Sequence, residues 1–188
     1  MDQSDKMAET KTTKAVKAQQ ASGKSAKQTA SEKPKLFAVV RIRGEVGVNG
    51  KLATNMELLR LHKKHRCVLV LANDNYMGML SKAKDYCTFG EADEETVKLL
   101  IESRGKLVAN KKLTAEFLKQ HKLTYESFAK KLVAGEIRIK DIEGVKPFFK
   151  LSPPKGGFAR GGIKKPYSMR GVLGYRGAEI NKLIRKMI

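Results

Sequence analysis

The sequence has no tryptophan and only two cysteines, Cys67 and Cys87, among its 188 residues. Two cysteines cannot form the disulfide framework that stabilises small secreted domains, so we expect a reducing compartment. No stretch approaches the roughly 18 uninterrupted apolar residues that predict a membrane span, and the N-terminal residues lack the apolar segment of a secretory signal. These absences predict a small intracellular protein with one compact core.

Acidic residues are also scarce. The chain carries 19 Asp and Glu against 39 Lys and Arg, which gives a formal net charge of +20. The shortage is greatest in residues 145–188, where eleven cations accompany a single acidic residue, Glu179. Such a charge repels itself unless a polyanion neutralises it, and nucleic acid is the most abundant polyanion in a cell. The uneven distribution predicts a nucleic-acid-binding end.

Recognisable catalytic motifs are missing. The sequence has no G-x-x-x-x-G-K-[ST] phosphate loop and no G-x-S-x-G nucleophile motif. The glycines of residues 44–50 are spaced G-x-x-G-x-x-G, which differs from the dinucleotide-binding pattern. His62, His65 and Cys67 lie near one another, but no second ligand pair follows at the spacing of a zinc site. We therefore expect no enzyme, no cofactor, no metal and no small-molecule substrate.

Residues 1–33 consist mainly of Lys, Ala, Ser, Thr and Gln and show no apolar periodicity. They cannot bury enough surface to offset the entropy lost on ordering, so we predict a disordered basic tail. Two interpretations stay open at this point: the tail orders against RNA, or it is a solvated extension without a role.

Residues 34–90 alternate between strand and helix patterns. Apolar, β-branched runs predict strands over residues 36–42, 67–72 and 85–90. Helical spacing through Leu61 predicts a helix that begins at Thr54 and has Lys63, Lys64 and His65 at its C-terminal end, where cations suit the helix dipole. A second helix is capped by Asn73 or Asp74. The order β-α-β-α-β predicts an α+β two-layer sandwich. The loop of residues 43–53 can reach roughly 36 Å and the first strand spans only about 23 Å, so parallel and antiparallel pairing of the first two strands both remain possible.

Residues 91–144 are predicted to form a helical appendage. Acidic residues cluster at the start of its first helix, and Thr114 and Thr124 can cap two further helices. Its nearly balanced charge favours a structural or protein-facing role. Residues 145–188 are predicted to form a short strand at residues 147–151, a basic loop and a C-terminal helix.

The most informative stretch is residues 153–176, in which cations, aromatic rings and glycines are interleaved. Cations neutralise phosphates, planar rings stack on bases and glycines let the backbone approach closely. With so few aliphatic side chains, this stretch is not expected to bury itself, and the alternative is a flexible, solvated basic loop. The candidate RNA-binding residues are Lys155, Phe158, Arg160, Lys164, Lys165, Tyr167, Arg170, Tyr175 and Arg176.

A second basic group lies in the first half of the chain, where strand and helix ends are expected to meet. It could line one edge of the sandwich and bind phosphates, or it could be ordinary charge at the ends of elements. Its members are Arg41, Arg43, Lys51, Lys63, Lys64 and Arg66.

Several motifs occur together in a familiar order. They are FAVVRIRG (37–44), LLRLHK (58–63), YMGML (76–80), TFGE (88–91), KKL (111–113), PPKGGF (153–158) and GYRG (174–177). In these motifs, the chain from about Phe37 to Ile188 resembles the archaeal and eukaryotic branch of the universal large-subunit ribosomal protein family L-thirty, called L-seven in eukaryotes. The version here looks archaeal.

The resemblance implies a ferredoxin-like core with a mainly antiparallel sheet, and it implies that residues 91–188 are an extension absent from the shorter bacterial form. It further implies a non-enzymatic structural role in the cytoplasmic large ribosomal subunit. The implied partners are the large ribosomal RNA, with the 5S RNA region as a further candidate, and neighbouring ribosomal proteins. The alternative is an assembly factor that binds precursor ribosomal RNA and then leaves. A nucleotide-binding enzyme built on the β-α-β unit is a third hypothesis.

Overall fold

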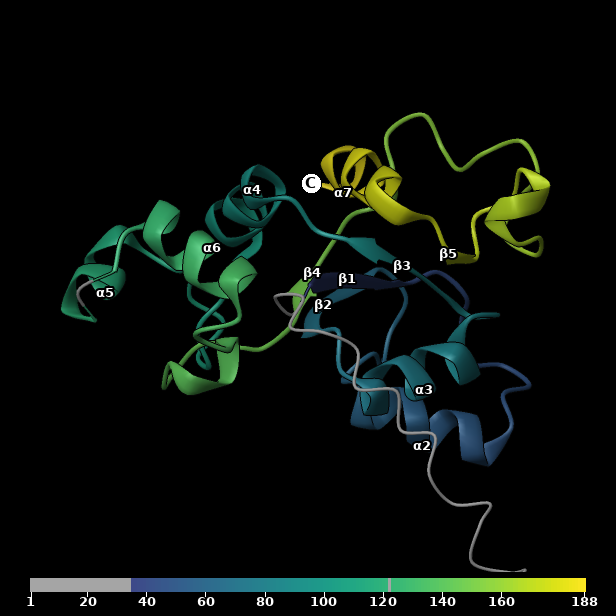
Figure 1. Ribbon diagram of the computed structural model, residues 1–188, viewed down its shortest axis with the longest axis horizontal. Coiled ribbons are helices and arrows are strands. Elements are labelled where there is room, and N and C mark those ends of the chain that lie inside the picture. Colours follow the sequence, from purple (N-terminus) through teal and green to yellow (C-terminus); the bar gives the residue numbers. More distant parts are fainter. Residues whose placement is uncertain (1–34, 122) are drawn as a thin grey trace, which may run out of the picture. The chain divides into compact units, whose positions relative to one another are not determined.

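The computed structural model describes residues 35–121 and 123–188 (Figure 1). The basic tail predicted for residues 1–33 lies outside the described residues. The strands are β1 (Leu36–Arg41), β2 (Arg66–Leu71), β3 (Cys87–Glu91), β4 (Phe149–Lys150) and β5 (Gly174–Tyr175). The α-helices are α2 (Gly50–Leu58), α3 (Asp74–Ala83), α4 (Glu94–Arg104), α5 (Ala115–Gln120), α6 (Tyr125–Ala134) and α7 (Ile180–Met187). Three short 3₁₀ turns are η1 (Ile139–Asp141), η2 (Tyr167–Met169) and η3 (Gly177–Glu179).

The described strands form one sheet in the order β4-β2-β1-β3-β5. Strand β1 is central and pairs antiparallel with both β2 and β3, for example Val39 with Val68 and with Phe89. Strand β4 extends β2 antiparallel, whereas β5 adds to β3 in parallel. The α+β class and the mainly antiparallel ferredoxin-like core are therefore confirmed. Strands β1 and β2 are antiparallel. This decides between the two pairings that the length of the connecting loop left open.

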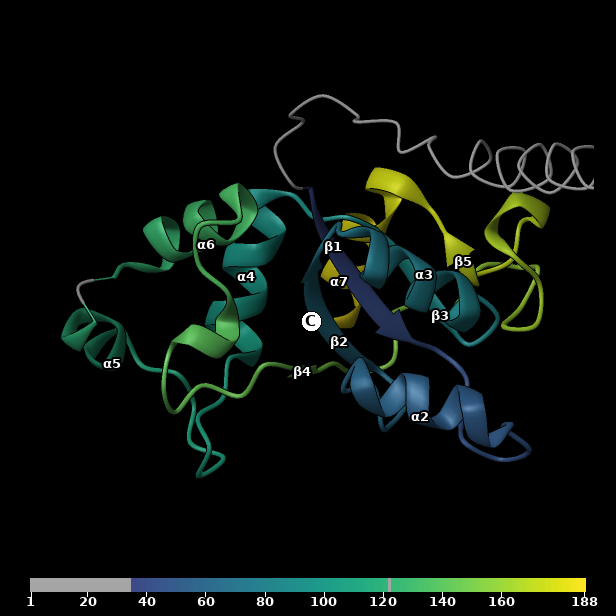
Figure 2. The same cartoon turned by 60° about the horizontal axis from the view of Figure 1, so that its bottom comes forward.

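The two faces of the sheet carry separate hydrophobic clusters, because side chains alternate along each strand. Phe37 and Val39 of β1 face α2 and α3, where they pack with Met56 and Leu80. Ala38 and Val40 point to the opposite face, towards α4, α6 and α7. Figure 1 shows α2 and α3 on one side of the sheet and α7 on the other, and Figure 2 shows the same arrangement after rotation.

The helices of residues 91–144 share the core of the sheet. Leu100 and Ile101 of α4 and Phe128 and Leu132 of α6 lie in the same buried cluster as Ala38 and Val40. Thr124 caps α6 with a reciprocal hydrogen-bonded box, and Gly135 ends it in the left-handed conformation. Thr114 stands at the N-cap of α5 without a side-chain bond. The two-layer core thus gains a second helical layer from the extension.

Helix α2 is displaced from its predicted position. Asn49 caps it, accepting from the Lys51 amide, so the helix starts at Gly50. It ends at Leu58 because Arg60 adopts a left-handed conformation, φ 59°, and turns the chain towards β2. Leu61 continues the helical spacing in the sequence but is buried in the turn that follows. The prediction of a helix from Thr54 to its end at residues 63–65 is therefore wrong at both ends.

Polar side chains attach the C-terminal residues to β3. Asn181 donates to the Glu91 carbonyl and accepts from the Asp93 amide, and Thr88 donates its hydroxyl to the Gly174 carbonyl. These bonds place the end of the basic loop at the edge of the sheet. In the part of the chain that is described, no helix combines the length and the apolarity needed to cross a membrane.

Candidate RNA interface

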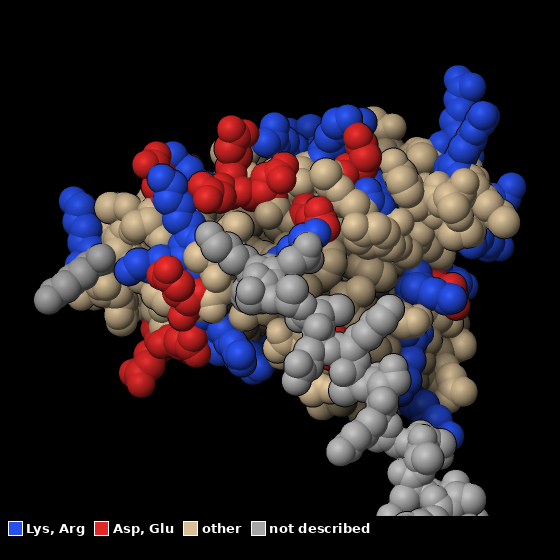
Figure 3. Space-filling model, viewed as in Figure 1, with Lys and Arg blue, Asp and Glu red and all other residues tan. Residues whose placement is uncertain are grey.

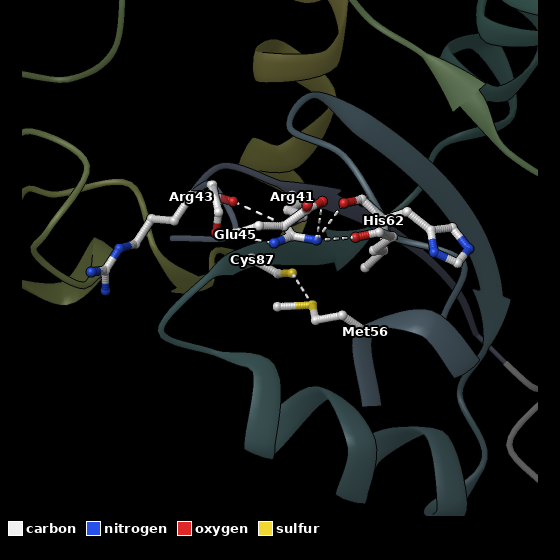
Figure 4. Close-up of polar contacts among 8 residues, drawn as sticks. Arg41, Arg43, Glu45, Met56, His62 and Cys87 are labelled. Atoms are coloured by element: carbon white, nitrogen blue, oxygen red, sulfur yellow. Dashed lines mark hydrogen bonds and ion pairs between the residues drawn. The ribbon is translucent and has the colours of Figure 1, made fainter. Parts of the chain in front are cut away.

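Arg41 stands at the end of β1 and is turned into the protein rather than towards solvent. Its residue is only 3% exposed. The guanidinium donates, over 2.6 to 3.0 Å, to the backbone carbonyls of Arg43, Gly44, Leu61 and His62 (Figure 4). Glu45 lies 3.6 Å from the same group. Because these acceptors occupy the guanidinium, we place Arg41 among the structural residues, as the residue that fastens the loops after β1 and α2.

Arg43 and Arg66 are half-buried and lie on aromatic rings. The Arg43 guanidinium is 4.7 Å from the Tyr86 ring centre and donates to the Asp85 carbonyl. The Arg66 guanidinium is 4.4 Å from the ring centre of Phe148. Such stacking holds an arginine in one orientation and still leaves N–H donors at the surface. Both residues can therefore meet a phosphate without first losing much conformational freedom.

The lysines of the first basic group have a different environment. Lys51, Lys63 and Lys64 are all exposed. Lys51 lies in the first turn of α2, and Lys63 and Lys64 lie in the turn before β2. Among the described residues, no carboxylate lies within ion-pair distance of these three side chains. Exposed lysines without a carboxylate partner present point charges that are free to meet an anion.

Residues 153–176 form a folded loop rather than an open strap. The Lys165 carbonyl accepts from the amides of Val172 and Leu173, and the Tyr167 amide donates back to the Leu173 carbonyl. Val172 and Leu173 are 1% and 3% exposed. The expectation that this stretch does not bury itself is therefore wrong, because two aliphatic side chains reach the main core and the backbone closes over them.

The cations of this loop remain at the surface. Four exposed side chains, which we call the loop cations, are Arg160, Lys164, Lys165 and Arg170. In the described chain none of them lies within ion-pair distance of a carboxylate. Lys155 is also exposed, and its amide donates to the Lys186 carbonyl at the end of α7. Arg170 adopts φ 60°, a left-handed conformation that closes η2.

Arg176 has a structural task. Its Nε donates to the Thr88 hydroxyl and a terminal nitrogen donates to the Val172 carbonyl. The guanidinium also lies 4.8 Å from the centre of the Tyr167 ring. Burial lowers the pKa of Arg176 from its ordinary value, since desolvation disfavours the charged form. This arginine positions the loop against β3 and has few donors left for phosphate.

The three candidate aromatic residues are used differently. Phe158 is half-buried and stacks on the His65 ring, with the two planes inclined by 15°. The ring of Phe158 is therefore engaged inside the protein. Tyr167 and Tyr175 keep 38% and 53% of their surface exposed. Tyr175 leans on Phe37 and Phe89, and Tyr167 lies under Arg176.

One depression of about 330 Å³ lies between the first basic group and the loop, and its cations are Arg43 and Lys64. The turn after β1 supplies one wall, the turn before β2 supplies a second, and the loop closes the third. Its lining contains no carboxylate side chain and is formed by Ile42, Arg43, Gly44, Val46, Lys64, His65, Tyr86, Phe158 and Ile163. Segments distant in sequence thus border one depression, to which the first basic group supplies Arg43 and Lys64 and the loop supplies Phe158 and Ile163.

His65 is an unusual member of this depression. It adopts φ 60°, and its Nδ1 is buried with no hydrogen-bond partner among the described atoms. Burial, with a smaller contribution from the neighbouring Lys64 charge, lowers the pKa of His65 from 6.5. The imidazole is therefore neutral near pH 7 and serves as a flat partner for Phe158.

Charge is separated across the surface. Figure 3 shows acidic side chains gathered over α4, with basic ones beside them, whereas basic side chains predominate at the end formed by the loop. Reasoning from sequence missed Lys84, which follows α3 and lies near the loop in space. The only signal for it was its position after a predicted helix, which ordinary helix-end charge also explains. Among the described residues no group of three or more metal-ligating side chains occurs.

The fold and the depression together describe a small α+β protein with a two-sided core and a basic, carboxylate-free depression at its surface. Comparison with known proteins agrees. The family model described as ribosomal protein L30p/L7e matches residues 37–87. The protein named large ribosomal subunit protein uL30 from Methanococcus vannielii is 50% identical over 153 residues, covering 81% of this chain and 99% of the relative. The protein of the same name from Archaeoglobus fulgidus is 46% identical over 154 residues, covering 81% of this chain and 99% of the relative. The one from Methanopyrus kandleri is 44% identical over 149 residues, covering 78% of this chain and 100% of the relative. The chain belongs to the ribosomal protein L30p/L7e family, in its archaeal form.

Proposed function

We propose that this chain is a structural, non-enzymatic constituent of the large ribosomal subunit that binds ribosomal RNA through the surface where its two basic groups meet. Membership of the family supports the ribosomal role in the cytoplasm and makes ribosomal RNA and ribosomal proteins its partners. The observation that carries the RNA-binding surface is the carboxylate-free depression between Arg43, Lys64 and the loop. RNA would supply the negative charge that this surface lacks.

The proposed contacts fall into two sets. The phosphate-binding residues are Arg43, Lys51, Lys63, Lys64, Arg66, Lys155, Arg160, Lys164, Lys165 and Arg170. Arg41, Phe158 and Arg176 instead hold the segments in place, since their polar or aromatic groups are engaged within the protein. Double-stranded RNA would be recognised through shape and phosphate spacing.

The segments of the chain divide this work. Residues 34–90 provide the rigid core and residues 145–188 most of the RNA contacts. Residues 91–144, which are nearly balanced in charge, carry acidic side chains over α4, and we assign this surface to neighbouring ribosomal proteins. The region of the 5S RNA is a further candidate contact.

The test of the ribosomal role is quantitative mass spectrometry of sucrose-gradient fractions from the native organism, washed in high salt. We expect about one copy per mature large subunit, including subunits in translating ribosomes. Presence in precursor particles alone would identify an assembly factor instead. Protein that stays at the top of the gradient would contradict both readings, and a nucleotide-binding assay would then test the enzyme hypothesis.

A further inference from the structure

A second depression, separate from the basic one, lies between β5, η2 and α3, on the face of the sheet that carries Phe37 and Phe89. It encloses about 510 Å³, within the range of about 300–1,000 Å³ typical of small-ligand sites. We call it the aromatic groove. Tyr175, Tyr167 and Leu173 form one wall, Met77, Ser81 and Lys84 form the other, and Phe37 and Phe89 form the floor.

The rings of the groove are held in fixed positions. Tyr175 is the register partner of Phe89 across the β3–β5 pair, so both rings lie on the same face of the sheet. The Tyr175 ring centre is 5.8 Å from that of Phe89 and 6.3 Å from that of Phe37. Arg176, bonded to Thr88, holds Tyr167 from behind. A prearranged aromatic wall loses little freedom when a flat ligand stacks on it.

The wall of the groove is open to solvent. Tyr175, Tyr167 and Met77 keep 53%, 38% and 39% of their surface in solvent. The one charged residue in the lining is Lys84, and the lining holds no carboxylate. The groove therefore offers apolar faces for a planar group and a cation for an attached anion. A nucleotide of single-stranded RNA presents both together, whereas an apolar peptide would leave the Lys84 charge unused.

We propose that the aromatic groove binds one unstacked nucleobase of the RNA, with the base against Tyr175 and the adjoining phosphate at Lys84. This inference rests on the proposed RNA-binding function and adds to it a base-contacting site outside the phosphate-binding surface. Stacking needs only the π-face of a base, so the site recognises an exposed base without reading its sequence. The candidate role of Tyr167 and Tyr175 in stacking thereby receives a specific location.

The test compares two single-stranded probes of equal charge, an adenosine decamer and an abasic ribose-phosphate decamer, with the full chain at fixed salt. We expect the wild-type protein to bind the adenosine decamer about tenfold more tightly. Tyr175→Leu should remove this preference and leave affinity for the abasic decamer unchanged, while Tyr175→Phe should retain it. Because the chain has no tryptophan but five tyrosines, the part of the tyrosine-fluorescence quenching that is lost in Tyr175→Phe reports stacking on Tyr175.

Met169→Ala is the matched control, since Met169 is 68% exposed in the same loop but does not line the groove. Circular dichroism melting checks that each variant is folded. Equal binding of the two decamers by the wild-type protein would overturn the proposal and leave the groove to a neighbouring protein. Retained preference in a folded Tyr175→Leu variant would also overturn it. Both results would leave the ribosomal role intact, because that role is tested separately by copy number in mature subunits.

Discussion

Arg41 at the end of β1 and the exposed cations of the loop of residues 153–176 have opposite environments. Arg41 is buried and donates to four backbone carbonyls. Lys164, Lys165 and Arg170 are exposed, and no described carboxylate pairs with them. Arg176 belongs to the loop by sequence but resembles Arg41 in its contacts.

The difference shows that local acceptors decide the role of an arginine. An arginine surrounded by backbone carbonyls is already satisfied, and moving it to a phosphate would leave those carbonyls without partners. An unpaired surface lysine gives up only water and counterions when it meets a phosphate. Removing a cation of the first kind should therefore affect folding, and removing one of the second kind should affect binding.

Arg41→Ala should produce the largest change. The substitution removes the donor from four carbonyls near the core, so we expect a loss of about 3 kcal/mol or more in the free energy of unfolding. Arg41→Lys should also destabilise, because an ammonium group has three donors and no planar fork. Urea unfolding followed by circular dichroism measures both, with Lys51→Ala as an exposed control expected to change by less than about 0.5 kcal/mol. A stable Arg41→Ala protein with weakened RNA binding would place Arg41 in the RNA-binding set after all.

The combined variant Lys164→Ala, Lys165→Ala and Arg170→Gly should leave folding intact and weaken RNA binding. Glycine is chosen at Arg170 because it accepts the left-handed φ without strain. If each cation meets one phosphate, the slope of log affinity against log salt falls by about two to three units. Filter binding to the large ribosomal RNA over a series of salt concentrations measures the slope.

Removing three exposed lysines of the helical extension, Lys119, Lys130 and Lys140, provides a control with a matched loss of charge. Its salt slope should change less than that of the loop variant, because these lysines lie away from the proposed surface. Equal slopes for the two variants would mean that total charge governs binding, and the loop cations would lose their assigned role.

The sequence was sufficient for the fold class because hydrophobic patterning reports on the core. The β-branched runs of β1 and β2, and the helical spacing of α3 and α4, all predicted elements that the structure contains. The ends of α2 were mispredicted because they depend on the Asn49 cap and the left-handed Arg60, neither of which changes the apolar period. The direction of the sheet came from family resemblance, since loop length permitted both.

The candidate site was less predictable, because composition does not reveal which hydrogen-bond acceptors surround a cation in the folded protein. Arg41 lies within the predicted strand of residues 36–42, but the sequence does not show that four backbone carbonyls surround its guanidinium, whereas Lys64 lines the basic depression. Phe158 was predicted to meet bases, yet its partner is His65, more than ninety positions away in the sequence. The aromatic groove also went unpredicted, since Met77, Lys84 and Tyr175 meet only after β5 pairs with β3.

Gly171→Ala should have a smaller effect that is confined to the loop. An added Cβ would collide with the Lys165 carbonyl, which holds the loop closed through Val172 and Leu173. Gly156→Ala is the matched control: its φ is +79° and nothing lies near its Cβ, so only backbone strain of about 1 kcal/mol is expected. Hydrogen exchange of the Val172 and Leu173 amides should accelerate more in Gly171→Ala than in the control. Equal acceleration in the two variants would show that the loop absorbs the collision.

The smallest expected effect is a pH dependence at His65, where the basic surface meets the core. The folded-state pKa lies below the unfolded value of 6.5, so the unfolded chain binds the proton more readily and stability falls as pH drops through 6.5. His65→Asn should reduce this loss between about pH 7.5 and about pH 5, since asparagine tolerates the left-handed φ. His62→Asn, at an exposed position in the same turn, should leave it unchanged.

Bound RNA should weaken the acid sensitivity at His65. A phosphate in the depression would favour the protonated imidazole and raise its pKa back towards the ordinary value. The free energy of unfolding, measured at about pH 7.5 and about pH 5 with and without the large ribosomal RNA, tests this reversal. The same sensitivity in the bound and free protein would place the phosphates away from His65. The RNA-binding surface would then be restricted to the loop. The contrast between Arg41, whose donors are used within the protein, and the loop cations, whose donors are exposed to RNA, would become sharper.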